Sequence, residues 1–239
     1  VDLTDKGNTK HNPVMFKITV NQLEIPYTDY TFTGEVVKRD DSLIDIPKYH
    51  AFVEELEVSV VPKKGRLYKN GAHVYTGKFT KDGLYTGQAV LYYSNGNIRY
   101  EGEFRHHNYS GFGKEYDKKG HLLYEGEWVN GLQYGKGKQY ENDMMIYDGY
   151  WFEGAKTGNG IDYSSSSCIY EGLWKDNMWH GRGTHYCEDG SIIHTTWSCG
   201  KKQGFGNIEL PDGTFHVNCE WHNDQLIEEG EHMFPSRRL

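Results

Sequence analysis

Tyr124-Glu125-Gly126-Glu127-Trp128 is the stretch that decides the architecture, because its ring-glycine-ring pattern returns along most of the chain. It comes back as Tyr147-Asp148-Gly149-Tyr150-Trp151 and as Tyr170-Glu171-Gly172-Leu173-Trp174, roughly every 23 residues. Seven residues after each tryptophan of this pattern comes a Gly-x-Gly pair: Gly135/Gly137, Gly158/Gly160, Gly181/Gly183 and, after Trp197, Gly204/Gly206. A period of this length is typical of stacked repeat proteins, in which each unit contacts mainly its neighbours.

One unit, residues 170–193, has the pattern of a β-hairpin. Tyr170, Gly172 and Trp174 alternate with other residues, so their side chains share one face of an extended strand. Asn177 then occupies a turn position that other units fill with glycine or, one residue late, with Asn108. Glycine and asparagine both accept the positive φ of a tight turn. A second strand follows and ends at the turn dipeptide Asp189-Gly190. The sequence therefore predicts an all-β fold, an elongated single-layer array of tandem β-hairpins.

The glycines of each unit predict how neighbouring hairpins pack. An aromatic ring can lie flat on a strand only where the adjacent position has no side chain, so rings of one unit are expected over glycines of the next. An isolated hairpin is marginally stable in water. Stability must then come from shared rings, each contributing roughly 1.5–3 kcal/mol when buried. A second column of tyrosines runs up the other strands: Tyr68, Tyr92, Tyr116, Tyr140, Tyr163 and Tyr186.

This combination of motifs resembles the MORN repeat (membrane occupation and recognition nexus), whose arrays form ribbon-like solenoids. The resemblance covers residues 63–213 in phase, and within this range a half-copy from Gly65 to Gly71 precedes the full copies. Residues 214–239 are interpreted as a degenerate terminal repeat and tail, since terminal units of an array lack one neighbour. The full copies start at Tyr75, Tyr100, Tyr124, Tyr147, Tyr170 and Ile193.

Residues 1–62 form a less regular N-terminal β segment or cap. Phe32, Gly34 and Val36 have the ring-glycine-apolar spacing of the repeat. This segment is either a cryptic repeat interrupted by the acidic loop 40–45 or an unrelated β segment that caps the first hairpin. The sequence leaves both interpretations open.

Composition limits the classes of partner. The chain has 26 Lys and Arg against 34 Asp and Glu, a net charge of −8, and no stripe of basic residues. This argues against nucleic acid as a partner and disfavours direct binding to an anionic membrane surface. No apolar run reaches membrane-spanning length. The four cysteines form no disulfide framework, which favours reduced thiols in an intracellular protein, with a removed organelle import sequence as an alternative.

Catalytic and metal-binding patterns are weak. Acid pairs such as Glu125/Glu127 suggest a glycosidase site, but they recur in several repeats, whereas an active site needs one pair. His185, Cys187, Cys219 and His222 have ligand-like spacings for zinc, but surface histidines and packed cysteines explain them more simply. No nucleotide-binding motif is present. We therefore expect no enzyme activity, no cofactor and no metal.

By resemblance, the protein is expected to be an interaction scaffold of cytoskeletal, ciliary or membrane-peripheral assemblies, with a helical or extended partner in its groove. Homodimerisation through terminal repeats is a further expectation, and the alternatives are a phospholipid-binding module or an accessory subunit of a large enzyme complex. The residues expected to bind the partner come from the most regular units: Tyr124, Glu127, Trp128, Tyr147, Trp151, Tyr170 and Trp174.

Overall fold

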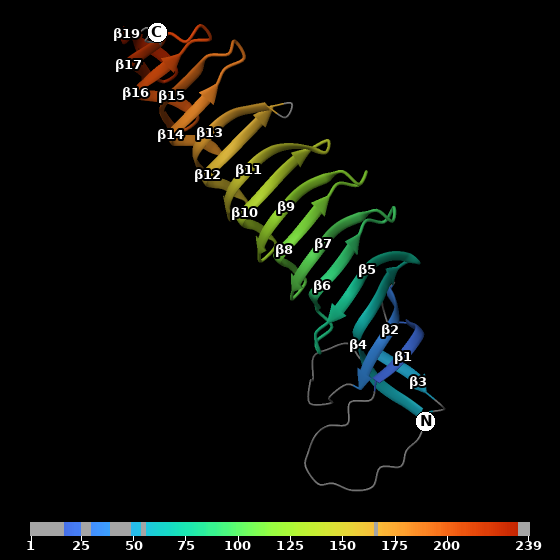
Figure 1. Ribbon diagram of the computed structural model, residues 1–239. Coiled ribbons are helices and arrows are strands. Elements are labelled where there is room, and N and C mark those ends of the chain that lie inside the picture. The colour runs from blue at the N-terminus through green and yellow to red at the C-terminus, as the bar shows by residue number, and fades with distance from the viewer. Residues whose placement is uncertain (1–16, 25–29, 39–48, 54–55, 165–166, 234–239) are drawn as a thin grey trace, which may run out of the picture.

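The computed structural model describes residues 17–24, 30–38, 49–53, 56–164 and 167–233. These residues form nineteen strands of one sheet with antiparallel pairings, and none of them is helical. The hairpins follow one another in sequence order along a single axis, so the molecule is an elongated ribbon (Figure 1). The predicted all-β array of tandem hairpins is confirmed. The described part of the chain thus offers no helix that could span a membrane.

Each hairpin of the array consists of a first and a second strand. The first strand pairs with its own second strand and with the second strand of the preceding hairpin. The first strands are β5 (Ala72–Phe79), β7 (Ile98–Arg105), β9 (Leu122–Val129), β11 (Met144–Phe152), β13 (Ser167–Lys175), β15 (Ile192–Ser198) and β17 (Phe215–His222). The second strands are β6 (Tyr85–Tyr92), β8 (Asn108–Tyr116), β10 (Leu132–Glu141), β12 (Ala155–Ser164), β14 (Met178–Tyr186), β16 (Lys201–Glu209) and β18 (Gln225–Glu228).

Tight turns connect the two strands of most hairpins. At the turn between β13 and β14, Asp176 and Asn177 have φ values of 51° and 66°, which is the type I′ geometry that suits the twist of the flanking strands. The predicted turn at Asn177 is confirmed. In the hairpin of β7 and β8, the pattern places Asn108 in this turn, and that placement is wrong. His106 and His107 hold the positive φ there, since histidine also tolerates this conformation, and Asn108 begins β8.

The core lies on the face of the sheet that carries the tyrosines, glycines and tryptophans of the motif, which we call the inner face. On β9 this face carries Tyr124, and the Tyr124 ring covers Gly126 and also Gly137 on β10. Tyr124 therefore covers glycines of its own hairpin. The prediction that it packs over a glycine of the neighbouring hairpin is wrong. The tryptophan makes the contact between hairpins: the Trp128 indole Nε1–H donates to the Gly113 carbonyl oxygen on β8 at 3.2 Å.

At the N-terminal end, β2 (Tyr30–Lys38) and β4 (Leu56–Lys69) form a hairpin built like those of the array. Gly34 lies opposite Gly65, and the fully buried Phe32 ring lies beside both glycines. The Phe32 ring also packs edge-on against Phe79 of β5 at 5.6 Å. This is the geometry that a cryptic repeat requires, whereas the acidic loop 40–45 lies outside the described residues. The domain bounds 1–62, 63–213 and 214–239 stay an interpretation.

The remaining strands lie at the two ends of the sheet. β1 (Lys17–Glu24) pairs with β2, and β3 (Tyr49–Val53) pairs with the first part of β4. β19 (Glu231–Met233) pairs with the beginning of β17, whose other end pairs with β18.

Candidate functional site

Most of the residues expected to bind a partner lie in the core. Tyr124, Trp128, Tyr147, Trp151, Tyr170 and Trp174 are each at most 6% exposed. Glu127 is exposed on the opposite, outer face, where its carboxylate accepts a hydrogen bond from the Lys136 backbone N–H at 3.1 Å. The structure therefore does not bring these seven residues together on one accessible surface.

The accessible part of the inner face comes from the second strands. In the second strands from β6 to β16, two positions point to this face. One lies two residues after the turn, and the other lies opposite the tyrosine position of the first strand in the same hairpin, which Ile193 fills in β15. All of these side chains are partly exposed. The first set is Tyr85, Tyr109, Gln133, Lys156, Trp179 and Lys202, and the second is Leu91, Glu115, Gln139, Asp162, His185 and Ile208.

These two sets differ from repeat to repeat, whereas the buried rings stay nearly constant. In a repeat array, constant positions form the frame, and variable positions on an accessible face are free to carry specificity. The sequence therefore did contain a signal for this surface, in the variable positions of the second strands. The regular motifs indicate the buried frame instead.

The first set of lining residues covers the buried tyrosines in different ways. Tyr109 stacks on Tyr100 with ring centroids 3.7 Å apart and planes 3° apart. The Lys156 ammonium lies over the Tyr147 ring, 4.4 Å from its centroid, as a cation–π contact. In the hairpin of Tyr124, the position two residues after the turn is held by Gln133. Among the described residues, no ring stacks in parallel on Tyr124.

Lys156, Asp162 and Glu115 are charged side chains that are half-buried on this face. Burial lowers the pKa of Lys156 and raises the pKa of Asp162, and the charge of each opposes the shift of the other. Their charged atoms are 3.8 Å apart. Burial also raises the pKa of Glu115, against the opposing effect of Arg99. Within the described part of the chain, the Glu115 carboxylate makes no hydrogen bond and no ion pair within 4.0 Å.

The inner face is hollowed at the centre of the array. A hollow of about 470 Å³ lies against strands β8 to β12, and its lining includes Glu115, Tyr124, Gln133, Gln139 and Lys156. The Gln139 Oε1 atom is buried and has no hydrogen-bond partner in the described structure. A buried oxygen without a donor is unfavourable, so a ligand that supplies an N–H group would gain by reaching it.

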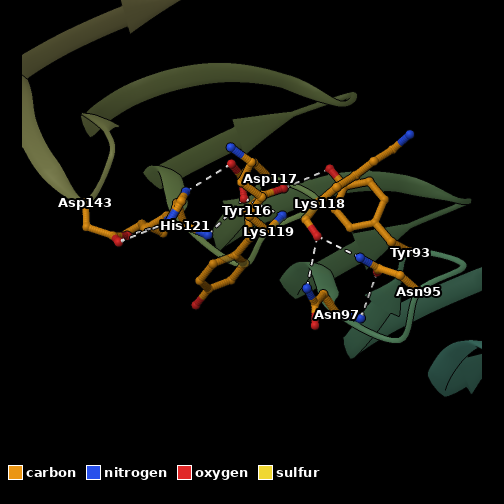
Figure 2. Close-up of polar contacts among 10 residues, drawn as sticks. Tyr93, Asn95, Asn97, Tyr116, Asp117, Lys118, Lys119, His121 and Asp143 are labelled. Atoms are coloured by element: carbon orange, nitrogen blue, oxygen red, sulfur yellow. Dashed lines mark hydrogen bonds and ion pairs between the residues drawn. The ribbon is translucent and has the colours of Figure 1, made fainter.

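Turns between successive hairpins hold the frame of this face together (Figure 2). The Asn95 side-chain amide donates to the Lys118 carbonyl oxygen at 2.7 Å, across one repeat. His121 contacts Asp117 at 3.2 Å in its own turn and approaches Asp143 of the next turn at 4.0 Å. These links fix the spacing of the hairpins, so the lining residues are presented at fixed intervals.

The acid pairs of the motif belong to the outer face. Glu125 pairs with Lys114 at 3.3 Å, and Asp148 pairs with Lys138 at 3.3 Å, each across adjacent strands. These carboxylates are thus part of a charge ladder on the sheet. His185 Nδ1 and Cys187 Sγ lie 3.6 Å apart, but no group of three or more metal-binding side chains forms anywhere in the described residues.

Comparison with protein-family models gives matches to the MORN repeat over residues 75–98, 100–122, 124–144, 147–161, 170–192 and 196–215. The first five matches begin at the predicted starts of the copies, and the sixth begins after Ile193. No curated protein matches the chain.

Proposed function

Because the chain belongs to the MORN repeat family, whose repeats indicate a role in protein or membrane interactions, we propose that it is a non-enzymatic scaffold for a protein partner. An extended or helical segment of that partner lies along the inner face. The observation that carries this proposal is the contrast between a buried aromatic frame and partly exposed lining residues that change from repeat to repeat.

The shape of the lining suits a long, narrow partner. Strands about 4.8 Å apart give six hairpins a length of roughly 60 Å, which matches a helix of about 40 residues. The lining is aromatic and apolar near Tyr85 and Leu91, polar near Gln133 and Gln139, and aromatic again at Trp179. Such a sequence of sites favours one partner segment in one register, through many weak contacts.

The cellular setting that we propose follows from the family resemblance. We place the protein inside the cell, in a cytoskeletal, ciliary or membrane-peripheral assembly, or as an accessory subunit of a large enzyme complex. Association of two copies through terminal repeats is compatible with the exposed Leu226 and Ile227 of β18. The scaffold itself requires no cofactor.

Site-specific photocrosslinking in native extract tests which face binds the partner. A photoreactive benzoylphenylalanine at Tyr109 samples the inner face, and one at Phe112 samples the outer face of the same strand. We expect the probe at position 109 to link to one segment of one protein, identified by mass spectrometry, and the probe at 112 to give no such product. Linkage from 112 alone would overturn the proposal.

A second candidate function is phospholipid binding, and exposed apolar side chains on the outer face favour it. Val129, Leu132, Tyr134 and Phe152 are each at least 38% exposed, and the Tyr134 and Phe152 rings lie 5.4 Å apart. The net charge of −8 disfavours an anionic surface. Salt-sensitive flotation with anionic liposomes, lost in a Phe152→Ser variant, would support lipid binding over the scaffold.

A further inference from the structure

The central hollow of the inner face contains acceptors without donors. Glu115 and Gln139 lie on either side of Tyr124 in the sheet, each directly opposite it on a neighbouring strand. The carboxylate of Glu115 and the amide oxygen of Gln139 both lack a hydrogen-bond partner within the described residues. Two unpaired acceptors flanking one buried ring favour a ligand that carries several N–H donors and a positive charge.

The surroundings select among cationic groups. Among the described residues, the lining of this hollow contains one cationic side chain, Lys156, which forms an ion pair with Asp162. The negative charge of Asp162 offsets the repulsion between Lys156 and a second cation. Aromatic side chains, Tyr124 and Trp151, form part of the lining. A guanidinium group is planar, less strongly hydrated than an ammonium group, packs against aromatic side chains and donates along two directions at once. An ammonium group does not match this combination.

We propose that this hollow receives one arginine side chain of the protein partner, whose guanidinium group donates to Glu115 and, after rotation of the Gln139 side chain, to Oε1 of Gln139. The proposal rests on the proposed scaffold function and names the chemistry of its central contact. The chain's own Arg99 does not occupy this position, since its guanidinium lies over the Tyr93 ring, 5.8 Å from the centroid.

The side chain at position 133 keeps the hollow open. In two other hairpins the equivalent residues Tyr109 and Trp179 place a ring on the buried tyrosine. A Gln133→Tyr variant should close the hollow in the same way. It therefore provides a change that blocks the site without disrupting the frame.

The test uses the full chain and a small probe in place of the unknown partner. N-acetyl-L-arginine amide is titrated into the protein, and the indole N–H resonance of Trp151 reports binding, because this ring lines the hollow. We expect a saturable shift with the arginine probe and none with N-acetyl-L-citrulline amide, its neutral analogue. An equal response to both probes, or no saturable response, would overturn the proposal.

Two acid-to-amide variants provide matched controls. Glu115→Gln should weaken binding of the arginine probe at least about tenfold, because a charged hydrogen bond is lost. Glu125→Gln makes the same chemical change on the outer face of the adjacent strand and should leave the affinity unchanged. Gln133→Tyr should abolish the shift while the protein stays folded. Unchanged affinity in both Glu115→Gln and Gln133→Tyr would contradict an arginine site here.

The outcomes separate this inference from the scaffold function. Arginine binding without any crosslinked partner at position 109 would leave the site standing and overturn the scaffold. A crosslinked partner together with no arginine binding would leave the scaffold standing and overturn this site.

Discussion

Single glycines under the tyrosine rings decide how tightly the array packs. A Cβ atom at Gly149 would lie 2.6 Å from the Gly160 Cα atom and equally close to the Tyr147 ring. Gly149→Val should therefore destabilise the protein by about 2–3 kcal/mol. Glu125→Gln weakens only a partly exposed ion pair and should cost less than about 1 kcal/mol. Thermal melts followed by circular dichroism compare the two, and equal midpoints would contradict the packing of rings over glycines.

The half-buried Glu115 predicts a pH-dependent stability. Burial raises the pKa of this carboxyl group in the folded state, so the folded protein holds its proton more tightly than the unfolded chain. Burying the charged carboxylate therefore destabilises the folded protein. This destabilisation is absent below the ordinary pKa of the group, grows as the pH rises through the raised pKa, and is complete above the raised pKa. Glu115→Gln should raise the melting temperature at pH 7, and this gain should shrink as the pH falls towards 4.5. A gain that is constant with pH would contradict the burial effect.

At the scale of one hairpin, the residue two positions after the turn tunes local stability. Tyr109 stacks on Tyr100, whereas Gln133 holds the equivalent position at Tyr124, on which no ring from the described part of the chain stacks in parallel. Gln133→Tyr should therefore stabilise the protein by about 0.5–1.5 kcal/mol, the contribution of one aromatic pair. Urea unfolding measures the change. Gln203→Tyr, on β16, is a control outside the hollow and should give no comparable gain.

The strands and turns could be predicted because their causes are local and repeat along the chain. Alternation of Tyr124, Gly126 and Trp128 fixes the strand and its buried face, and a turn residue that accepts positive φ, such as Asn177, fixes the hairpin. The same reasoning failed at Asn108, where the two histidines before it adopt the turn conformation. Regularity in the sequence therefore predicted regularity in the fold.

The candidate binding surface could not be predicted in this way. Alternation places Tyr124 and Gln139 on one face but does not say which of them is covered. The pairing of β9 and β10 also shifts register between Tyr134 and Gly137, and such a bulge bends the strand locally, which the sequence pattern does not reveal. The regular motif therefore predicts partner binding at the rings of the frame, which the structure places in the core.

The molecule as a whole behaves as a one-dimensional stack, since the extensive contacts run between strands that are adjacent in the sheet. The stability of such an array is approximately a sum of the units and their nearest-neighbour interfaces. A defect in one unit should then open locally and leave distant units protected. Under the proposed function, a partner would bind along the face without requiring every hairpin to respond together.

Hydrogen exchange of the Gly149→Val variant tests this independence. The change lies in β11, whose tyrosine ring and tryptophan contact β10 and β12. We expect amide protection to fall in β10 to β13 and to stay close to the wild-type level in β5 and β16, several hairpins away on either side. Glu125→Gln should leave protection unchanged throughout. A uniform loss of protection from β5 to β16 would show one cooperative unit and contradict a nearest-neighbour array.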